Sequence, residues 1–312
     1  MNGSKRVPAT QLINGEACSA YYSPTSYMEA LEFEPREGDI IEVTFTRSGT
    51  HLVQQMIQLI LNKGQSTKTF AEFNKRAPFL EVQGLREASG APRLLRTHLP
   101  MNRLRLSDEA KYVYVARNPW DCCVSNFHLM QDFPLFEFAD GTFDDFLDTF
   151  LDGRFGFGDY FDHIISGYGH KHDANVFFVT YEEICRDKVD VVHRLARFLG
   201  EEYGDMMRSD SALLKLVLER SSVEFMKNLL RTDPKEMSQV FTRANVPIIS
   251  TAEASQDTKE AKCSFVRKGT VGGWKSYFSP EIVAKMQHKI DEKFKGTDIM
   301  MLWMNQELPD KH

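Results

Sequence analysis

The chain is poor in cysteine, in net positive charge and in long apolar runs, and each shortage excludes a class of protein. Its 312 residues include only five cysteines, and these are Cys18, Cys122, Cys123, Cys185 and Cys263. The number is odd, two are adjacent and none forms a Cys-x-x-Cys pair, which speaks against a disulfide framework or a zinc site and favours a reducing compartment. The formal net charge of −6 disfavours general binding to nucleic acid.

Apolar residues make up 42% of the chain and charged residues 26%, which is the composition of a globular protein with a sizeable core. No stretch approaches the roughly 20 apolar residues that cross a membrane. Residues 1–20 also lack the apolar centre of a signal peptide. We therefore expect a cytoplasmic protein with no metal, no nucleic-acid partner and no membrane partner.

Strand-like and helix-like patterns alternate along the chain. Runs rich in β-branched and aromatic residues are typical of buried strands, and they occur at 40–45, 93–96, 111–116 and 176–181. Apolar stripes with helical spacing occur at 52–60, 189–199 and 213–218. This alternation predicts an α/β fold with a central parallel sheet and helices on both faces. No linker interrupts 40–200, so we expect one domain over residues 1–312.

The segment 40–52 predicts an anion site. The expected strand runs into a turn with one glycine, Gly49, and then into an amphipathic helix. Such a turn aims backbone N–H groups and a helix N-terminus at one point, to which Arg47, Ser48 and Thr50 add a cation and two hydroxyls. The loop is P-loop-like, but it lacks the second glycine and the Gly-Lys-Ser/Thr ending of a Walker A motif. A phosphate or a sulfate is the natural ligand.

Five segments taken together resemble the cytosolic sulfotransferases. They are 46–50 (TRSGT), 96–100 (RTHLP), 115–121 (VARNPWD) with Ser125, 179–183 (VTYEE) and 266–275 (VRKGTVGGWK). The resemblance implies an enzyme that moves the sulfuryl group of 3′-phosphoadenosine-5′-phosphosulfate (PAPS) to a hydroxyl or amine and releases PAP. It also implies that residues 1–38 contribute to the acceptor side, and that 231–264 form a mobile loop.

The resemblance implies a set of PAPS-binding residues. PAPS carries anionic groups at two ends, so 47–50 are expected at the phosphosulfate and Arg117, Ser125 and 267–269 at the 3′-phosphate. Tyr181 and Ser221 are expected near the adenine. The full expected set is Arg47, Ser48, Gly49, Thr50, His51, Leu52, Arg117, Ser125, Tyr181, Ser221, Val223, Phe265, Val266, Arg267, Lys268 and Gly269.

The expected catalytic groups are His98, Arg96 and Arg47. His98 follows a short strand, and its imidazole titrates near neutral pH, so it is the expected general base for the acceptor hydroxyl. Arg96 and Arg47 stand where the family has lysines, and their charge is expected to stabilise the leaving oxygen. A guanidinium is a planar fork rather than a compact ammonium, so the geometry differs from that of the family.

Other positions also depart from the family pattern. Leu52 and Val223 replace aromatics that flank the adenine, which predicts weaker nucleotide binding or a compensating aromatic such as Phe225. His51 replaces a threonine of the family, and two interpretations stay open: the imidazole faces the ligand, or the replacement has no functional effect. Segment 275–284 departs from the family's dimer motif, which predicts a monomer or a dimer through another surface.

Acceptor identity and some alternatives stay open at this point. Asp132, Phe133, Phe136 and Phe241 are expected on the acceptor side, together with Phe127, Phe138, Phe155, Phe157 and Tyr160. A carboxylate at Asp132 would favour a small phenolic amine. The alternatives are a PAP- or PAPS-binding protein with lost or weak catalysis, a relative that sulfonates and then eliminates, and a P-loop kinase.

Overall fold

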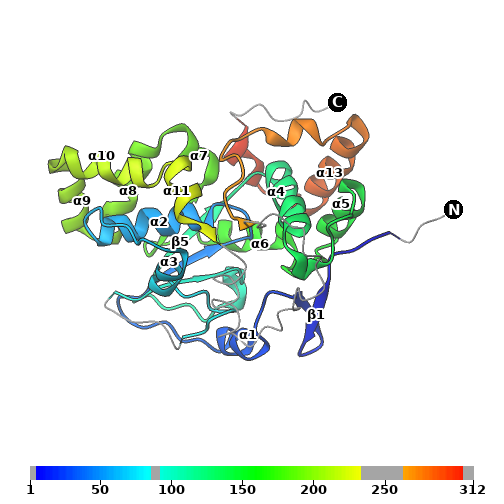
Figure 1. Cartoon of the computed structure of the whole chain (residues 1–312), viewed down its shortest axis with the longest axis horizontal. Helices are drawn as coiled ribbons and strands as arrows, with labels where there is room; N and C mark the ends of the chain where they lie inside the picture. Colours follow the sequence, from blue (N-terminus) through cyan, green and yellow to red (C-terminus); the bar gives the residue numbers. More distant parts are fainter. Residues whose placement is uncertain (1–4, 86–91, 233–262, 305–312) are drawn as a thin grey trace, which may run out of the picture.

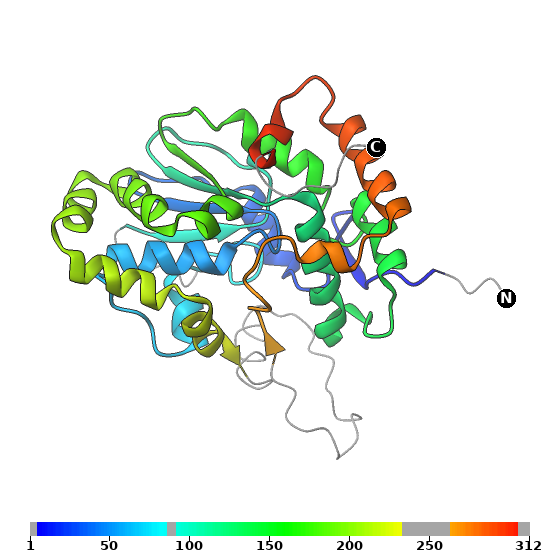
Figure 2. The same ribbon diagram turned by 90° about the horizontal axis from the view of Figure 1, so that it is seen from above.

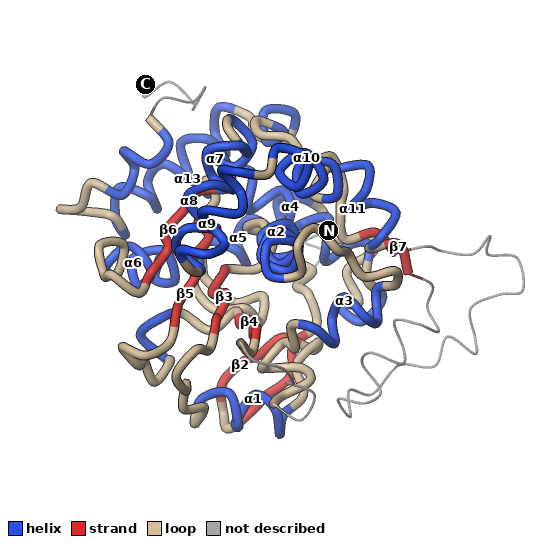
Figure 3. The backbone as a smooth tube through the Cα atoms, turned by 90° about the vertical axis from the view of Figure 1, so that its left-hand side faces the viewer, coloured by secondary structure: helices blue, strands red, loops and turns tan. Residues whose placement is uncertain are grey.

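The computed structural model describes residues 5–85, 92–232 and 263–304. Its centre is a four-stranded parallel sheet in the order β4-β3-β5-β6, and Figure 3 shows the strands side by side in this order. The strands are β3 (Ile40–Thr44), β4 (Leu94–Thr97), β5 (Lys111–Ala116) and β6 (Val176–Thr180). The predicted α/β class with a central parallel sheet is confirmed.

Each face of the sheet packs on its own apolar cluster because side chains alternate along a strand. Ile40, Val113 and Val115 belong to a cluster with α2 (Thr50–Leu61), α8 (Lys188–Leu199) and α10 (Ser211–Arg220). Ile41 and Val43 belong to the cluster on the other face, which includes α4 (Pro119–Asp132), α5 (Phe143–Leu151) and α6 (Tyr160–Gly169). Helices therefore cover both faces, as Figures 1 and 2 show.

The other helices connect and flank this core. They are α1 (Pro24–Leu31), α3 (Phe70–Arg76), α7 (Tyr181–Arg186), α9 (Glu201–Ser209), α11 (Val223–Leu229) and α13 (Pro280–Lys293). Short 3₁₀ turns are η1 (Met101–Arg103), η2 (Pro134–Phe136), η4 (Gly273–Ser276) and η5 (Ile299–Trp303). Ser279 caps α13 by accepting from the Ile282 N–H. The capped start of this helix lies within segment 275–284, where the sequence departs from the family's dimer motif. The oligomeric state stays a prediction.

The last predicted strand ends one residue early for a local reason. Thr180 is the N-cap of α7, because its side chain accepts from the Glu183 N–H. The Glu183 carboxylate accepts in return from the Thr180 N–H at 2.8 Å, which completes a capping box. The chain therefore turns from strand to helix at Thr180, and Tyr181 lies in the first turn of α7 at the carboxyl edge of the sheet.

Two small hairpin-like pairs lie outside the main sheet. Strands β1 (Thr10–Ile13) and β2 (Glu16–Ser19) pair antiparallel, and the preceding Ala9 N–H donates to the Phe136 carbonyl at 2.7 Å. Strands β7 (Arg231–Thr232) and β8 (Cys263–Ser264) pair antiparallel. Of the loop predicted at 231–264, residues 233–262 lie outside the described residues, and Phe241 is among them.

Candidate active site

The loop between β3 and α2 has the backbone geometry of an anion cradle. Arg47 and Gly49 both have positive φ, at 65° and 116°, so the chain turns sharply before Thr50 begins α2. A Cβ on Gly49 would lie 2.9 Å from Cδ2 of Tyr181, so this position needs glycine for space as well as for conformation. The cradle faces the N-terminus of a 12-residue helix, where an anion is stabilised by free N–H groups.

This cradle opens into a cavity of about 350 Å³ at the carboxyl edge of the sheet. Every expected PAPS-binding residue except Ser48 lines it, and so do Arg96, His98, Phe133 and Phe136. Ser48 is fully buried behind the loop, beside the Cys122 thiol. Sequence reasoning did not find several further lining residues, namely Tyr21, Thr46, Phe79, Leu129, Ile184, Cys185, Lys188, Met226 and Thr270.

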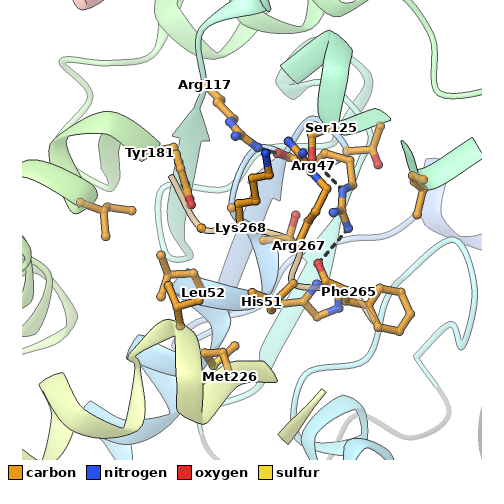
Figure 4. Close-up of a pocket in the computed structure, with 18 of the residues that line it drawn as sticks. Arg47, His51, Leu52, Arg117, Ser125, Tyr181, Met226, Phe265, Arg267 and Lys268 are labelled. Carbon is orange, nitrogen blue, oxygen red and sulfur yellow. Dashed lines mark hydrogen bonds between the residues drawn. The ribbon is translucent and has the colours of Figure 1, made fainter. Parts of the chain in front are cut away.

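Four cationic side chains gather at one end of the cavity. Figure 4 shows Arg47, Arg117, Arg267 and Lys268 converging near Ser125. Arg47 donates from Nε to Ser125 Oγ at 3.1 Å and from Nη1 to the Phe265 carbonyl at 3.0 Å. No aspartate or glutamate is among the described residues that line the cavity. The described cavity wall therefore carries positive charge at this end without a carboxylate beside it, although the charge of Asp132 acts on Arg47 from outside the wall.

The pKa of Arg47 reports the same excess of positive charge. Burial, followed by the charges of Arg117 and Arg267, lowers the pKa of Arg47 to about 10. Arg117 is held in place by two contacts. It donates to the Arg47 carbonyl at 2.9 Å, and its guanidinium lies 4.5 Å from the ring centre of Tyr181. A bound polyanion would relieve the mutual repulsion of these fixed cations.

Asp121 positions the loop that carries Arg267 and Lys268. Its carboxylate accepts from the Gly272 N–H at 2.7 Å and from the Trp274 N–H at 3.0 Å. The Asp121 N–H in turn donates to Asn118, the N-cap of α4. Sequence reasoning missed this role, because the only signal was an acidic residue in the first turn after Asn118.

His98, the expected general base, lines the cavity. Its Nδ1 lies 2.7 Å from the Thr44 carbonyl, which accepts a hydrogen bond, so Nδ1 carries the proton and Nε2 is the basic nitrogen. Burial lowers the pKa of His98 to about 3, while the bond to Thr44 opposes this and His163 and Arg96 reinforce it. The imidazole is therefore neutral at physiological pH, and the expectation that it titrates near neutral pH is wrong for this buried site.

A buried carboxylate fixes the main chain at His98. Glu81 accepts from the His98 N–H at 2.7 Å and from Thr97 Oγ1 at 2.8 Å. Burial raises the pKa of Glu81 to about 7, although the hydrogen bonds to Thr97 and to the main chain oppose this. Glu81 thus holds the backbone of the expected base from behind, and sequence reasoning missed it.

Arg96 is buried, and its terminal nitrogens face two helices. Nη1 donates to Gln54 on α2 at 3.0 Å, and Nη2 donates to Asn74 on α3. Glu42 is its partner in the strand register, yet neither oxygen of this fully buried carboxylate has a hydrogen-bond partner among the described residues. Burial raises the pKa of Glu42 well above its usual value. The expected contact of Arg96 with the leaving oxygen stays a prediction.

The adenine end of the cavity differs from the expectation. The compensating aromatic predicted at Phe225 does not line the cavity, and Met226 does. Phe225 instead packs on the small cluster around Leu229. The hydroxyl of Ser221 donates to the Val217 carbonyl at 2.8 Å, so its side chain is committed to its own helix.

The acceptor end is aromatic, but Asp132 is not part of it. Tyr21 and Phe79 line the cavity with the predicted Phe133, Phe136 and Phe157. Phe79 and Phe157 contact the His98 ring edge to face, with ring centroids 4.6 and 5.9 Å away. Asp132, the last residue of α4, is exposed and does not line the cavity. Phe127, Phe138, Phe155 and Tyr160 are buried core residues away from the cavity wall.

Comparisons with known proteins identify the family of this chain. A family model described as "Sulfotransferase domain" matches residues 37–298. Sulfotransferase 1B1 of Canis lupus familiaris is 30% identical over 283 residues, covering 86% of this chain and 87% of the relative. Amine sulfotransferase of Oryctolagus cuniculus is 29% identical over 289 residues, covering 90% and 89%.

A solved structure is similar over nearly the whole chain. Mouse sulfotransferase SULT7A1 complexed with PAP superposes with a TM-score of 0.68 at 25% identity, covering 95% of this chain and 97% of that one. The chain belongs to the sulfotransferase family. It is a PAPS-dependent sulfotransferase, so the predicted enzyme class and cofactor are confirmed and the kinase alternative is wrong.

Two properties of the described residues are relevant to partners. No group of three or more His, Cys, Asp or Glu side chains in the described ranges is placed to hold a metal ion. None of the helices in the described part of the chain combines the length and apolarity needed to cross a membrane.

Proposed function

We propose that this enzyme moves the sulfuryl group of PAPS to the hydroxyl of a small aromatic acceptor, with His98 as the general base. One observation carries the proposal. A single cavity joins four converging cations at one end to the aromatic side chains around His98 at the other. A nucleotide with two anionic ends and a flat, apolar acceptor are the two ligands that such a cavity fits.

The residues present fit PAPS at both anionic ends. Arg117, Arg267 and Lys268 would hold the 3′-phosphate, since two guanidinium forks and an ammonium meet there without a carboxylate. The cradle at Gly49 would hold the 5′ end, because a Cβ there would fill the space beside Tyr181. Leu52 and Val223 would enclose the adenine with aliphatic surface.

The acceptor end favours a neutral phenol over a phenolic amine. Arg96 lines the cavity near His98, and no carboxylate does so among the described residues. An ammonium group on the acceptor would therefore meet like charge and no counter-charge. A relative that is 29% identical to this chain is named amine sulfotransferase, but the described wall offers no carboxylate to pair with an amine.

His98 supplies the proton chemistry. PAPS, when bound, supplies an activated sulfuryl group on a good leaving group. Nε2 of His98 would take the acceptor proton as the acceptor oxygen bonded to sulfur and the bond from sulfur to the 5′-phosphate oxygen of PAPS broke. The Thr44 carbonyl keeps the proton on Nδ1, so Nε2 always presents its lone pair. The buried charge of Arg96 favours negative charge on the leaving oxygen.

A panel assay tests the proposal. The enzyme is incubated with PAPS and a phenol, a phenolic amine of equal size or an aliphatic alcohol, and sulfate ester and PAP are quantified. The phenol should be the best acceptor, and His98→Ala should lower kcat by about 10²–10⁴ without changing the affinity for PAP. His170→Ala, which removes a partly exposed histidine, is the control. Full activity of His98→Ala would refute the role of His98 as general base. A strong preference for the amine would refute the preference for a neutral phenol.

A further inference from the structure

His51 occupies a position between the two halves of the cavity. It is the second residue of α2, directly after Thr50. Its ring lies 6.0 Å from the Phe73 ring at an interplanar angle of 27°, and 5.0 Å from the Phe265 ring. Figure 4 shows it beside Phe265, below the group of cations. The imidazole is thus fixed by two aromatic contacts while it lines the cavity.

The polar side chains around His51 are committed to the protein. Arg47 donates to Ser125 and to a carbonyl, and Thr50 Oγ1 lies 2.7 Å from Thr44 Oγ1. Both terminal nitrogens of Arg96 donate to side-chain amides. In the part of the chain that the structure describes, no group forms a hydrogen bond with either ring nitrogen of His51. His51 is therefore a polar group held in place with its hydrogen-bonding capacity unused.

We propose that His51 donates a hydrogen bond to an oxygen of the sulfuryl group that is being transferred, which makes it a catalytic residue of this enzyme. The inference rests on the proposed function, because it needs PAPS in the cradle and the acceptor at His98. His51 forms no bond and takes no proton in the step. It offers one N–H where charge shifts as the sulfuryl group moves.

The environment of His51 keeps the imidazole neutral. Burial, followed by the charges of Arg96, Arg47 and His98, lowers the pKa of His51 well below its usual value. A neutral imidazole has one N–H donor and one acceptor nitrogen. His51 therefore does not add to the positive charge that binds the nucleotide, and its effect is confined to the atoms it touches.

A comparison of PAP with PAPS tests the inference directly, because the two nucleotides differ by the sulfuryl group. His51→Phe keeps a ring between Phe73 and Phe265 but removes both nitrogens. We expect this variant to change the Kd for PAP by less than about twofold, to raise the Kd for PAPS about tenfold, and to lower kcat about 10²-fold. His51→Gln restores an N–H donor and should recover most of the lost kcat. His128→Phe is the matched control, since His128 is near the same cations and does not line the cavity.

Three results would overturn the inference. Equal losses of affinity for PAP and PAPS in His51→Phe would mean that the ring nitrogens act on a part that both nucleotides share, and not on the sulfuryl group. An unchanged kcat and an unchanged Kd for PAPS would leave His51 no role. No recovery of kcat in a folded His51→Gln would mean that the lost N–H donor does not account for the effect. These three results differ from failure of the proposed function. In that case the wild-type enzyme would sulfonate no phenol, although its Kd values for PAP and PAPS would still differ.

Discussion

Asp121→Asn tests whether one carboxylate positions the loop that holds the 3′-phosphate. The wild-type carboxylate accepts two main-chain hydrogen bonds, from Gly272 at 2.7 Å and from Trp274 at 3.0 Å. Asparagine keeps one acceptor oxygen and turns an NH₂ group toward the second N–H. The variant therefore loses one charge-assisted hydrogen bond, which contributes about 1.5–3 kcal/mol. If that loss falls on the loop, PAP should bind about 10- to 150-fold more weakly.

Calorimetric titration with PAP measures the effect, and Asp159→Asn is the matched control. Asp159 also accepts two main-chain N–H bonds, from Phe161 and Asp162, but it does not line the cavity. Both variants should lose thermal stability, and only Asp121→Asn should lose PAP affinity. Equal Kd values for PAP in both variants would refute the reasoning, because Asp121 would then be an ordinary helix-capping residue.

Three further predictions follow from the same geometry. Gly49→Ala should raise the Kd for PAP by about tenfold or more, because it combines strain at positive φ with contact on Tyr181. Gly15→Ala, at positive φ in open space, should lower only the stability of the fold, and an equal Kd for PAP in the two variants would contradict this. Arg96→Lys reaches at most one of two amide oxygens, so urea unfolding should show a loss of about 1–3 kcal/mol, and an unchanged midpoint would mean the amides are not essential partners. Burial lowers the pKa of His163 to about 3. Below pH 6.5 the unfolded chain therefore binds a proton that the folded chain does not, and the free energy of unfolding falls as pH falls. In His163→Phe it should fall less steeply than in the wild type, by up to about 1.4 kcal/mol per pH unit. Parallel curves of unfolding free energy against pH for the two proteins would contradict this.

Local pattern was enough to predict the scaffold of the site. The strands, the turn at Gly49 and the helix after it follow from side-chain alternation and a glycine between two periodic segments. Strand ends at one edge of a parallel sheet necessarily meet, so Arg47, His98, Arg117 and Tyr181 could be placed around one cavity before the structure was known.

Contacts between distant segments could not be predicted in this way. Arg96 donates to Gln54 and Asn74, which come from two different helices, and neither carries a local signal. The absence of Asp132 from the cavity wall has a simpler cause. Leu129 lines the cavity from α4, and Phe133 lines it from the C-cap position, where the chain has left the helix, while Asp132 between them is exposed. The sequence places the end of a helix only to within about a turn, so it does not decide which of these side chains faces the cavity.

Binding of PAP compared with ATP is the most direct measurement of the central claim, that Arg117, Arg267 and Lys268 form a site for the 3′-phosphate of PAPS. Thermal unfolding is followed with each nucleotide, and PAP at about 100 times its Kd should stabilise the fold by roughly 2.7 kcal/mol. ATP lacks the 3′-phosphate and should stabilise it far less, and Arg267→Ala should remove most of the difference. Equal stabilisation by PAP and ATP in the wild-type enzyme would contradict the account.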